Sequence, residues 1–127
     1  RIKIFSMSGD YISAIGGYGK GLGQFVRPKG IAVDQEKNLF VVDAGFENAQ
    51  IFNEKGQLLM FFLGSYQAPG DMYLPAKVAI SYDVNKYFEK FVYHGYNLKY
   101  IILVTNSFGK AKVSIYGRIE VNTKTRK

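Results

Sequence analysis

The sequence contains no cysteine and no tryptophan, and only one histidine and three prolines occur among its 127 residues. Without cysteine, the chain forms no disulfide bond and offers no thiolate to a metal ion. The single histidine, His94, has no second histidine and no dense carboxylate cluster near it in the sequence, whereas a catalytic zinc site needs three protein ligands. We therefore expect no metal site and no cofactor.

Long hydrophobic runs and acidic residues are also scarce. No apolar run reaches the roughly 18 residues that a membrane helix requires, so no membrane span is expected. Ten Asp and Glu stand against 17 Lys and Arg, which gives a formal charge of +7. This charge favours anionic partners such as nucleic acid or an acidic protein. The basic residues are spread along the chain, however, and this spread favours an ordinary Lys-rich surface over a nucleic-acid footprint.

Aromatic residues and glycine are abundant, and an 11-residue pattern occurs twice. Ten Tyr, ten Phe and 14 Gly are typical of an all-β protein with many tight turns. The stretch from Gly23 to Val33 recurs 47 residues later as Gly70 to Ile80, with the same glycine, proline and apolar positions. A period in the mid-forties is typical of propeller blades. The sequence therefore predicts a repeat architecture.

Short strands separated by turns account for the first two units. Residues 1–15 indicate a hairpin with a turn at 8–10, and residues 31–34, 39–43, 50–53 and 57–63 indicate a four-stranded meander. The second and fourth of these strands are apolar on both faces. A half-buried sheet would alternate instead, so we expect this sheet to lie between two neighbouring blades.

The third unit carries an insertion. Asp43 corresponds to Asn106, which lies 63 residues later rather than 47, so about 16 residues are added between Ser81 and Tyr100. Apolar residues at helical spacing within the added segment predict a short amphipathic helix: Val84, Phe88, Phe91 and Val92. Asp83 is the expected N-cap and Gly95 the expected end. Strands are expected again at 100–106 and 112–117, and residues 119–121 are expected to form part of a last strand.

The predicted fold is all-β: a partial β-propeller of about two and a half four-stranded antiparallel blades, with a short helical insertion in the last blade. Residues 1–16 form the second half of a blade, and residues 17–64 form a complete blade. Residues 65–121 form a divergent blade with its insertion at 82–99, and residues 122–127 form a basic tail.

The complete blade resembles an NHL repeat, the blade unit of a six-bladed β-propeller. The resemblance rests on Phe25, Pro28, Gly30, Ile31, Ala32, Val33, Asp34, Asn38, Leu39, Val42, Asp43, Ile51, Phe52 and Gly56. The last unit is similar to the closing part of bacterial NHL-type propellers, some of which are exported. The resemblance therefore implies a periplasmic or extracellular location, while the residues themselves leave the compartment open. The third blade departs from the repeat, with Lys77 in place of glycine and Ser81 in place of aspartate.

Two and a half blades cannot close a ring of six. An open wedge would leave apolar strands such as residues 58–63 near an exposed face, and such a face invites pairing. We therefore expect either that the chain is the C-terminal piece of a longer propeller or that copies of it associate. Further blades or subunits are accordingly expected partners.

No residue pattern indicates an enzyme, and no catalytic residue is predicted. The glycine-rich segment 16–23 does not fit a phosphate-binding loop, and no G-x-S-x-G sequence occurs. Asp34 and Asp43 stand at strand ends, where aspartate accepts hydrogen bonds from turn backbone N–H groups.

Two surfaces are candidate binding sites. Basic residues at the starts of the first strands, with nearby aromatic residues, are expected around one mouth of the propeller channel: Arg27, Lys29, Lys77, Tyr18, Phe25 and Tyr73. Stacking and phosphate attraction would let this mouth bind single-stranded RNA, but the same residue types also anchor proteins. The second candidate is the insertion, with Tyr87, Phe88, Phe91, Tyr93 and Tyr96 as interface residues.

Three functions follow from these surfaces, in decreasing order of support. The first is a non-enzymatic propeller scaffold that mediates protein–protein interaction. The second is an RNA-binding NHL module that uses the basic and aromatic mouth. The weakest is a zinc-dependent lyase-like propeller, which the resemblance raises and the lone histidine disfavours.

Overall fold

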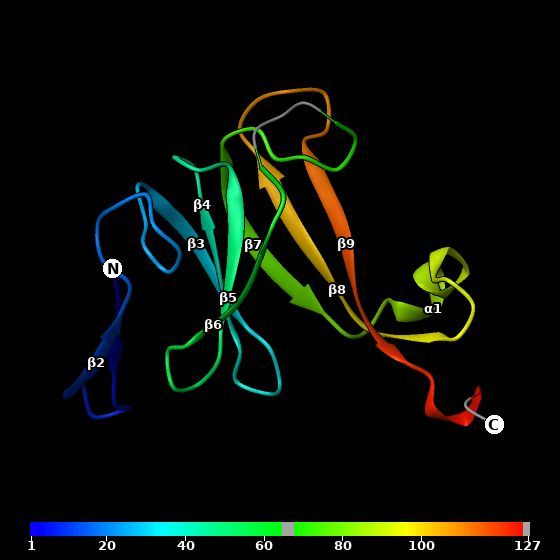
Figure 1. Cartoon of the computed structure of the whole chain (residues 1–127), viewed down its shortest axis with the longest axis horizontal. Coiled ribbons are helices and arrows are strands. Elements are labelled where there is room, and N and C mark those ends of the chain that lie inside the picture. The colour runs from blue at the N-terminus through cyan, green and yellow to red at the C-terminus, as the bar shows by residue number, and fades with distance from the viewer. Residues whose placement is uncertain (65–67, 126–127) are drawn as a thin grey trace.

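Three antiparallel sheets make up the computed structural model, which describes residues 1–64 and 68–125. The first sheet holds two strands, the second four and the third three, and they lie side by side along the long axis of the molecule (Figure 1). The chain is a partial β-propeller, as the sequence predicts.

The first sheet is the predicted hairpin. Strand β1 (Ile2–Phe5) pairs with β2 (Tyr11–Ile15), and a turn joins them. Gly9 in this turn has a φ of +92°, a conformation that favours glycine. The prediction of a hairpin with a turn at residues 8–10 is confirmed.

The second sheet is the complete blade. Strands β3 (Pro28–Val33), β4 (Leu39–Asp43), β5 (Asn48–Phe52) and β6 (Leu58–Phe62) pair in chain order. The predicted meander is confirmed, although Pro28 begins β3 instead of preceding it. Gly30 allows β3 to approach the third sheet closely, because a Cβ there would lie 2.8 Å from the Cα of Lys77.

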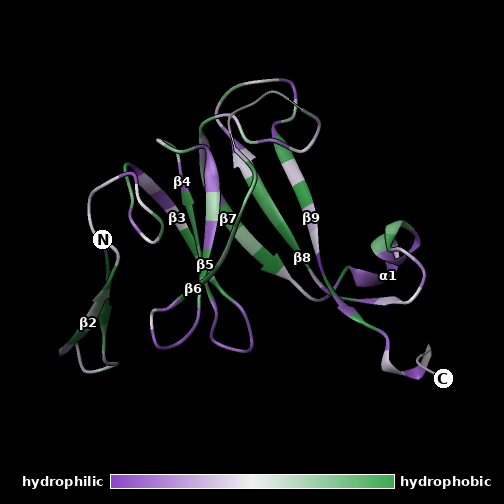
Figure 2. Ribbon diagram, viewed as in Figure 1, coloured by the Kyte–Doolittle hydropathy of each residue, from purple (hydrophilic) through white to green (hydrophobic). Residues whose placement is uncertain are grey.

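Both faces of β4 are buried, as predicted for the second strand. Phe40 and Val42 pack into a cluster with the third sheet, whereas Leu39 and Val41 pack into a cluster with the first. The hydrophobic colouring of Figure 2 accordingly concentrates in central strands such as β4 and β8. The fourth strand does not follow this pattern.

Strand β6 corrects the prediction of two-sided burial for residues 57–63. Leu59, Met60 and Phe61 are 51%, 42% and 51% exposed. The apolar composition of β6 was therefore a poor guide to its burial, because an outermost strand is covered on both faces only where neighbouring blades reach that far. The exposed apolar strand expected at residues 58–63 is therefore present, but it belongs to the sheet that has a neighbouring sheet on each side.

The third sheet contains three strands rather than four among the described residues. Strand β7 (Pro75–Ser81) pairs with β8 (Tyr96–Asn106), which pairs with β9 (Val113–Val121). Residues 119–121 continue β9 and do not belong to a separate strand. A short 3-10 turn, η2 (Thr123–Thr125), follows, and Arg126 and Lys127 of the predicted basic tail lie outside the described residues.

The predicted helix is present but shorter than expected. It consists of one α-helical turn, α1 (Asn85–Phe88), followed by one 3-10 turn, η1 (Glu89–Phe91). Val84 occupies the N-cap position without a side-chain hydrogen bond, so the assignment of Asp83 as the cap was wrong. Residues 96–99, expected within the insertion, already belong to β8. Within the described part of the chain, no helix has the length and apolar character needed to cross a membrane.

Candidate interaction surfaces

Asp43 organises the end of the complete blade. Its carboxylate accepts hydrogen bonds from the backbone N–H groups of Val26, Arg27, Gly45 and Phe46, at 2.8–3.2 Å. Asn106 stands at the same place in the third sheet, where its Oδ1 accepts from the N–H of Tyr73 at 3.0 Å. The predicted structural role of the strand-end aspartate is confirmed, and this carboxylate is fully used by the turn.

Asp34 performs a similar role at the opposite end and also connects two sheets. It accepts hydrogen bonds from the N–H groups of Glu36 and Asn38 and from the hydroxyl of Tyr100, the last at 2.8 Å. Burial raises the pKa of Asp34, but the hydrogen bonds from Asn38, Tyr100 and Glu36 together outweigh it, so the pKa lies below its ordinary value. Burial first, and then the bond to Asp34, raise the pKa of Tyr100 well above its ordinary value.

Two further contacts hold the turn between β3 and β4 against the third sheet. The hydroxyl of Tyr82 accepts a hydrogen bond from the N–H of Gln35 at 2.9 Å. Lys99 forms an ion pair with Glu36, and this hydrogen bond raises the pKa of Lys99. Together with the Asp34–Tyr100 bond, these contacts lock the second and third sheets together.

The basic candidates lie at the starts of the inner strands. Arg27, Lys29 and Lys77 are all exposed, and the close approach of β3 and β7 at Gly30 brings Lys29 and Lys77 onto neighbouring strands. Within the described residues, no ion pair is found for these three side chains. The basic part of the expected channel mouth therefore stays a prediction.

The aromatic candidates of the mouth separate into exposed and buried residues. Tyr18 is 85% exposed in the loop before β3, and Tyr73 is 38% exposed in the loop before β7, where it packs against Phe108. Phe25 is 1% exposed and packs edge-on against Phe52, at 5.7 Å between ring centroids. Phe25 is therefore a core residue and offers no surface to a partner.

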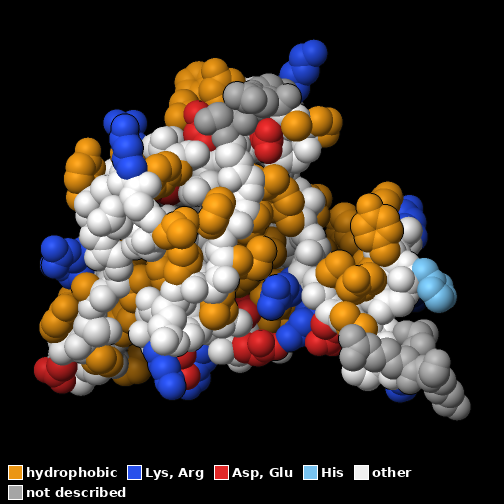
Figure 3. All heavy atoms as spheres, in the orientation of Figure 1, with side chains coloured by type: hydrophobic (Ala, Val, Ile, Leu, Met, Phe, Trp, Pro, Cys, Tyr) orange, Lys and Arg blue, Asp and Glu red, His pale blue; other side chains and the backbone are white. Residues whose placement is uncertain are grey.

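The insertion exposes most of its aromatic residues. Tyr87, Phe91 and Tyr93 are 75%, 72% and 80% exposed, and Tyr96 is 43% exposed, whereas Phe88 is half-buried. In Figure 3 hydrophobic side chains gather on the lobe that contains α1, with the histidine beside them. The segment from α1 to the start of β8 thus presents several large rings to solvent.

A third surface was missed by the sequence reasoning. We call it the open blade face: Leu103, Thr105, Val113 and Ile115, on the side of the third sheet that faces away from the complete blade. Equivalent positions of the two sheets follow from the strand pairing, because Asp43 and Asn106 each pair with the proline that begins the inner strand. Three residues earlier, Phe40 and Leu103 are therefore equivalent. Their partners on the next strand are Ile51 and Ile115.

Equivalent positions in the two sheets differ sharply in exposure. Ala49 and Ile51 are 0% and 5% exposed because the third sheet covers them, whereas Val113 and Ile115 are 49% and 47% exposed. The signal that could have revealed this face is the alternation of apolar residues in β9, which continues beyond Gly117 to Val121.

The described residues contain no cluster of metal-ligating side chains. In that part of the chain no three His, Cys, Asp or Glu residues lie close enough together to hold a metal ion. His94 is exposed at the end of the insertion.

Comparison with known proteins places the chain in a family. Residues 1–126 match the family described as "6-bladed beta-propeller". The chain belongs to this six-bladed β-propeller family. No curated protein matches the sequence significantly. The match agrees with the sheets of two, four and three strands, and it supports a propeller without distinguishing NHL repeats from other blade types.

Membership in this family explains the uncovered side of the third sheet. Each blade of a closed propeller packs between two neighbours around a central channel. Of the three sheets described, only the second has a neighbour on each side, as its two core clusters show. The open blade face is thus a blade surface without its neighbour.

Proposed function

We propose that the chain is a non-enzymatic NHL-type propeller scaffold that mediates protein–protein contact and packs against further blades or subunits. The observation that carries this proposal is the difference between Ile51 and Ile115, two equivalent residues of which one is buried and the other 47% exposed. The same face is covered in the second sheet and half-exposed in the third, which is typical of a surface that packs against a partner.

The opposite end of the molecule offers a second uncovered strand. Ile31 and Val33 of β3 are 53% and 58% exposed on the side that faces the first sheet, which contributes only the hairpin β1–β2. The exposed side of β3 in one copy and the open blade face of another copy therefore differ in composition. Contact between them would be head-to-tail, and head-to-tail contacts extend into larger assemblies or close into rings.

The test is sedimentation velocity of the chain and of the open-face variant, Val33→Lys with Val113→Lys. Both positions are exposed, so the substitutions should leave the fold intact, while a charge in each apolar face opposes its burial. We expect the wild-type chain to form species larger than a dimer and the open-face variant to lose them. Equal behaviour of the two proteins, at matched circular dichroism spectra, would contradict the proposal.

RNA binding is the second candidate, and the exposure of Arg27, Lys29 and Lys77 at the starts of the two inner strands favours it. The test is a salt titration of binding to a single-stranded RNA oligonucleotide. Phosphate contacts predict an affinity that falls steeply with salt and a shallower slope in the Arg27→Glu, Lys29→Glu double variant. RNA binding that this double variant leaves unchanged would exclude Arg27 and Lys29 as its phosphate contacts.

A further inference from the structure

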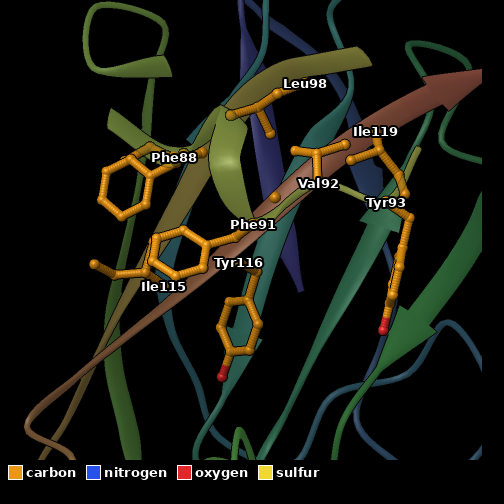
Figure 4. Close-up of a pocket in the computed structure, with 10 residues that line it drawn as sticks. Phe88, Phe91, Val92, Tyr93, Leu98, Ile115, Tyr116 and Ile119 are labelled. Carbon is orange, nitrogen blue, oxygen red and sulfur yellow. The ribbon is translucent and has the colours of Figure 1, made fainter. Parts of the chain in front are cut away.

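The insertion and the end of the third sheet enclose an apolar groove, and Ile115 is the one residue of its lining that also belongs to the open blade face. Its volume is about 360 Å³. The lining comes from the insertion and from strands β8 and β9: Phe88, Phe91, Val92, Tyr93, Leu98, Ile101, Ile115, Tyr116, Gly117 and Ile119. Figure 4 shows the rings of Phe88 and Phe91 beside Ile115, with Val92 near Ile119.

The groove lies largely beyond the body of the blade. Ile102 is the equivalent of Leu39, where β4 begins, but β8 begins six residues earlier, at Tyr96. Strand β9 likewise continues five residues past Tyr116, the equivalent of the last residue of β5. We call residues 96–101 and 117–121 the hairpin extension. A neighbouring blade of ordinary length would cover the open blade face and leave this extension free.

The insertion is firmly attached to the hairpin extension. The side-chain amide of Asn85 donates a hydrogen bond to the carbonyl of Lys99 at 2.8 Å, and the N–H of Asn122 donates to the carbonyl of Gly95 at 2.7 Å. Ile101 is 2% exposed although it belongs to the side of the sheet that faces away from the complete blade. The insertion is therefore held to the third sheet at both of its ends, at Asn85 and at Gly95.

We propose that this groove binds the insertion of a second copy of the chain, with the exposed rings of Tyr87 and Tyr93 as the groups that enter it. The exposed rings and the groove lie in one surface patch. In an isologous dimer the same patch on each copy supplies both the projecting groups and the groove that receives them, so this arrangement suits such a dimer. Tyrosine is also among the residues that most often dominate interface energies.

The charge of the insertion, which carries the projecting rings, favours a second copy over an acidic or nucleic-acid partner. Residues 82–96 contain two acidic and two basic side chains, so the remaining 112 residues carry the whole +7 charge. Two copies repel one another wherever that charge is concentrated, and they meet at least cost where it is zero. Glu89 and Lys90 are adjacent in the chain, opposite in charge and both exposed.

Sedimentation equilibrium of the open-face variant tests this inference, because that variant removes the head-to-tail association required by the proposed function. We expect a monomer–dimer equilibrium. The Tyr87→Ser, Tyr93→Ser double variant should weaken the dimer about tenfold or more, since exposed rings at an interface centre act as hot spots. The matched control is Tyr18→Ser, an equally exposed loop tyrosine, which should change the dissociation constant by less than about twofold.

A second variant keeps every ring and changes only the charge. Glu89→Lys changes the charge of residues 82–96 from zero to +2 on each copy, so the dimer should weaken at low salt and recover as salt is raised. Absence of a dimer in the open-face variant would overturn the inference and leave the proposed function standing. A dimer that all three tyrosine substitutions leave unchanged would also overturn it. If the open-face variant loses the species larger than a dimer but keeps a dimer that depends on Tyr87 and Tyr93, the proposed function and this inference are both supported.

Discussion

At the scale of single residues, the contact between the two inner strands depends on the missing side chain of Gly30. A Cβ there would meet the Cα of Lys77 at 2.8 Å and the carbonyl oxygen of Ala76 at 2.9 Å, and both are backbone atoms that cannot move away cheaply. We expect Gly30→Ala to destabilise the fold by about 1–3 kcal/mol, the usual cost of overpacking. Urea unfolding measures this.

Gly17→Ala is the matched control, because a Cβ at Gly17 has no atom within 4 Å. Its effect should stay within about 0.5 kcal/mol. Equal effects of the two substitutions would show that close strand approach does not limit the residue at position 30.

The Asp34–Tyr100 bond predicts a dependence of stability on pH. Because the pKa of Asp34 is lower in the folded protein than the ordinary value, the unfolded chain binds a proton more readily. The stabilisation is therefore present above about pH 4, the ordinary pKa of aspartate, and is lost as the pH falls through the lower folded value. Urea unfolding at several pH values should show a smaller loss of stability below pH 4, roughly, in Asp34→Asn than in wild type.

Tyr100→Phe removes one hydrogen bond to the same carboxylate. We expect a loss of about 1.5–3 kcal/mol above pH 5, roughly, because the bond has a charged acceptor. Tyr82→Phe is the control, since its hydroxyl contacts the neutral N–H of Gln35 and should contribute about 0.5–1.5 kcal/mol. If Tyr100→Phe cost no more than Tyr82→Phe, the Asp34–Tyr100 bond would not be the main link between the sheets.

At the scale of elements, equivalent strands in different blades differ because their neighbours differ. Ile51→Ala should cost about 2–5 kcal/mol, as for a buried aliphatic residue. Ile115→Ala, the same change at the equivalent position of β9, should cost less than about 1 kcal/mol in the chain alone, because this side chain is 47% exposed. Both changes are made in the open-face variant, at concentrations where it is monomeric, so that association does not cover Ile115; thermal or urea unfolding provides the comparison, and similar costs would contradict the difference in exposure between the two positions.

The strands of the first two sheets were predictable because local patterns determine them. The apolar runs of β4 and the turn at Gly9 depend on nearby residues alone, and both were located correctly. The exposure of β6 and the length of β8 were not predictable, because they depend on which neighbours pack nearby and on where an insertion rejoins the sheet. Similarly, the burial of Phe25 follows from its contact with Phe52, 27 residues away.

The candidate surfaces show the same division. The aromatic residues of the insertion were identified from composition, and most of them are exposed. The groove beside them requires Ile115 and Ile119 of β9, which no local pattern joins to residues 88–93. A site made by two distant segments becomes visible only when their register is known.

At the scale of the whole molecule, three sheets of a six-bladed propeller leave two blade surfaces uncovered. Apolar association between such surfaces differs from RNA binding in its response to salt. Screening weakens contacts to phosphates, whereas burial of apolar area is strengthened by excluded salts such as sulfate.

Sedimentation velocity of the wild-type chain over a range of protein concentrations, at low and high sulfate, tests the central claim most directly. An open propeller segment should show species larger than a monomer, and their share should rise with both protein and sulfate concentration. A folded, monodisperse monomer under all of these conditions would contradict the claim that its blade surfaces are built to be covered.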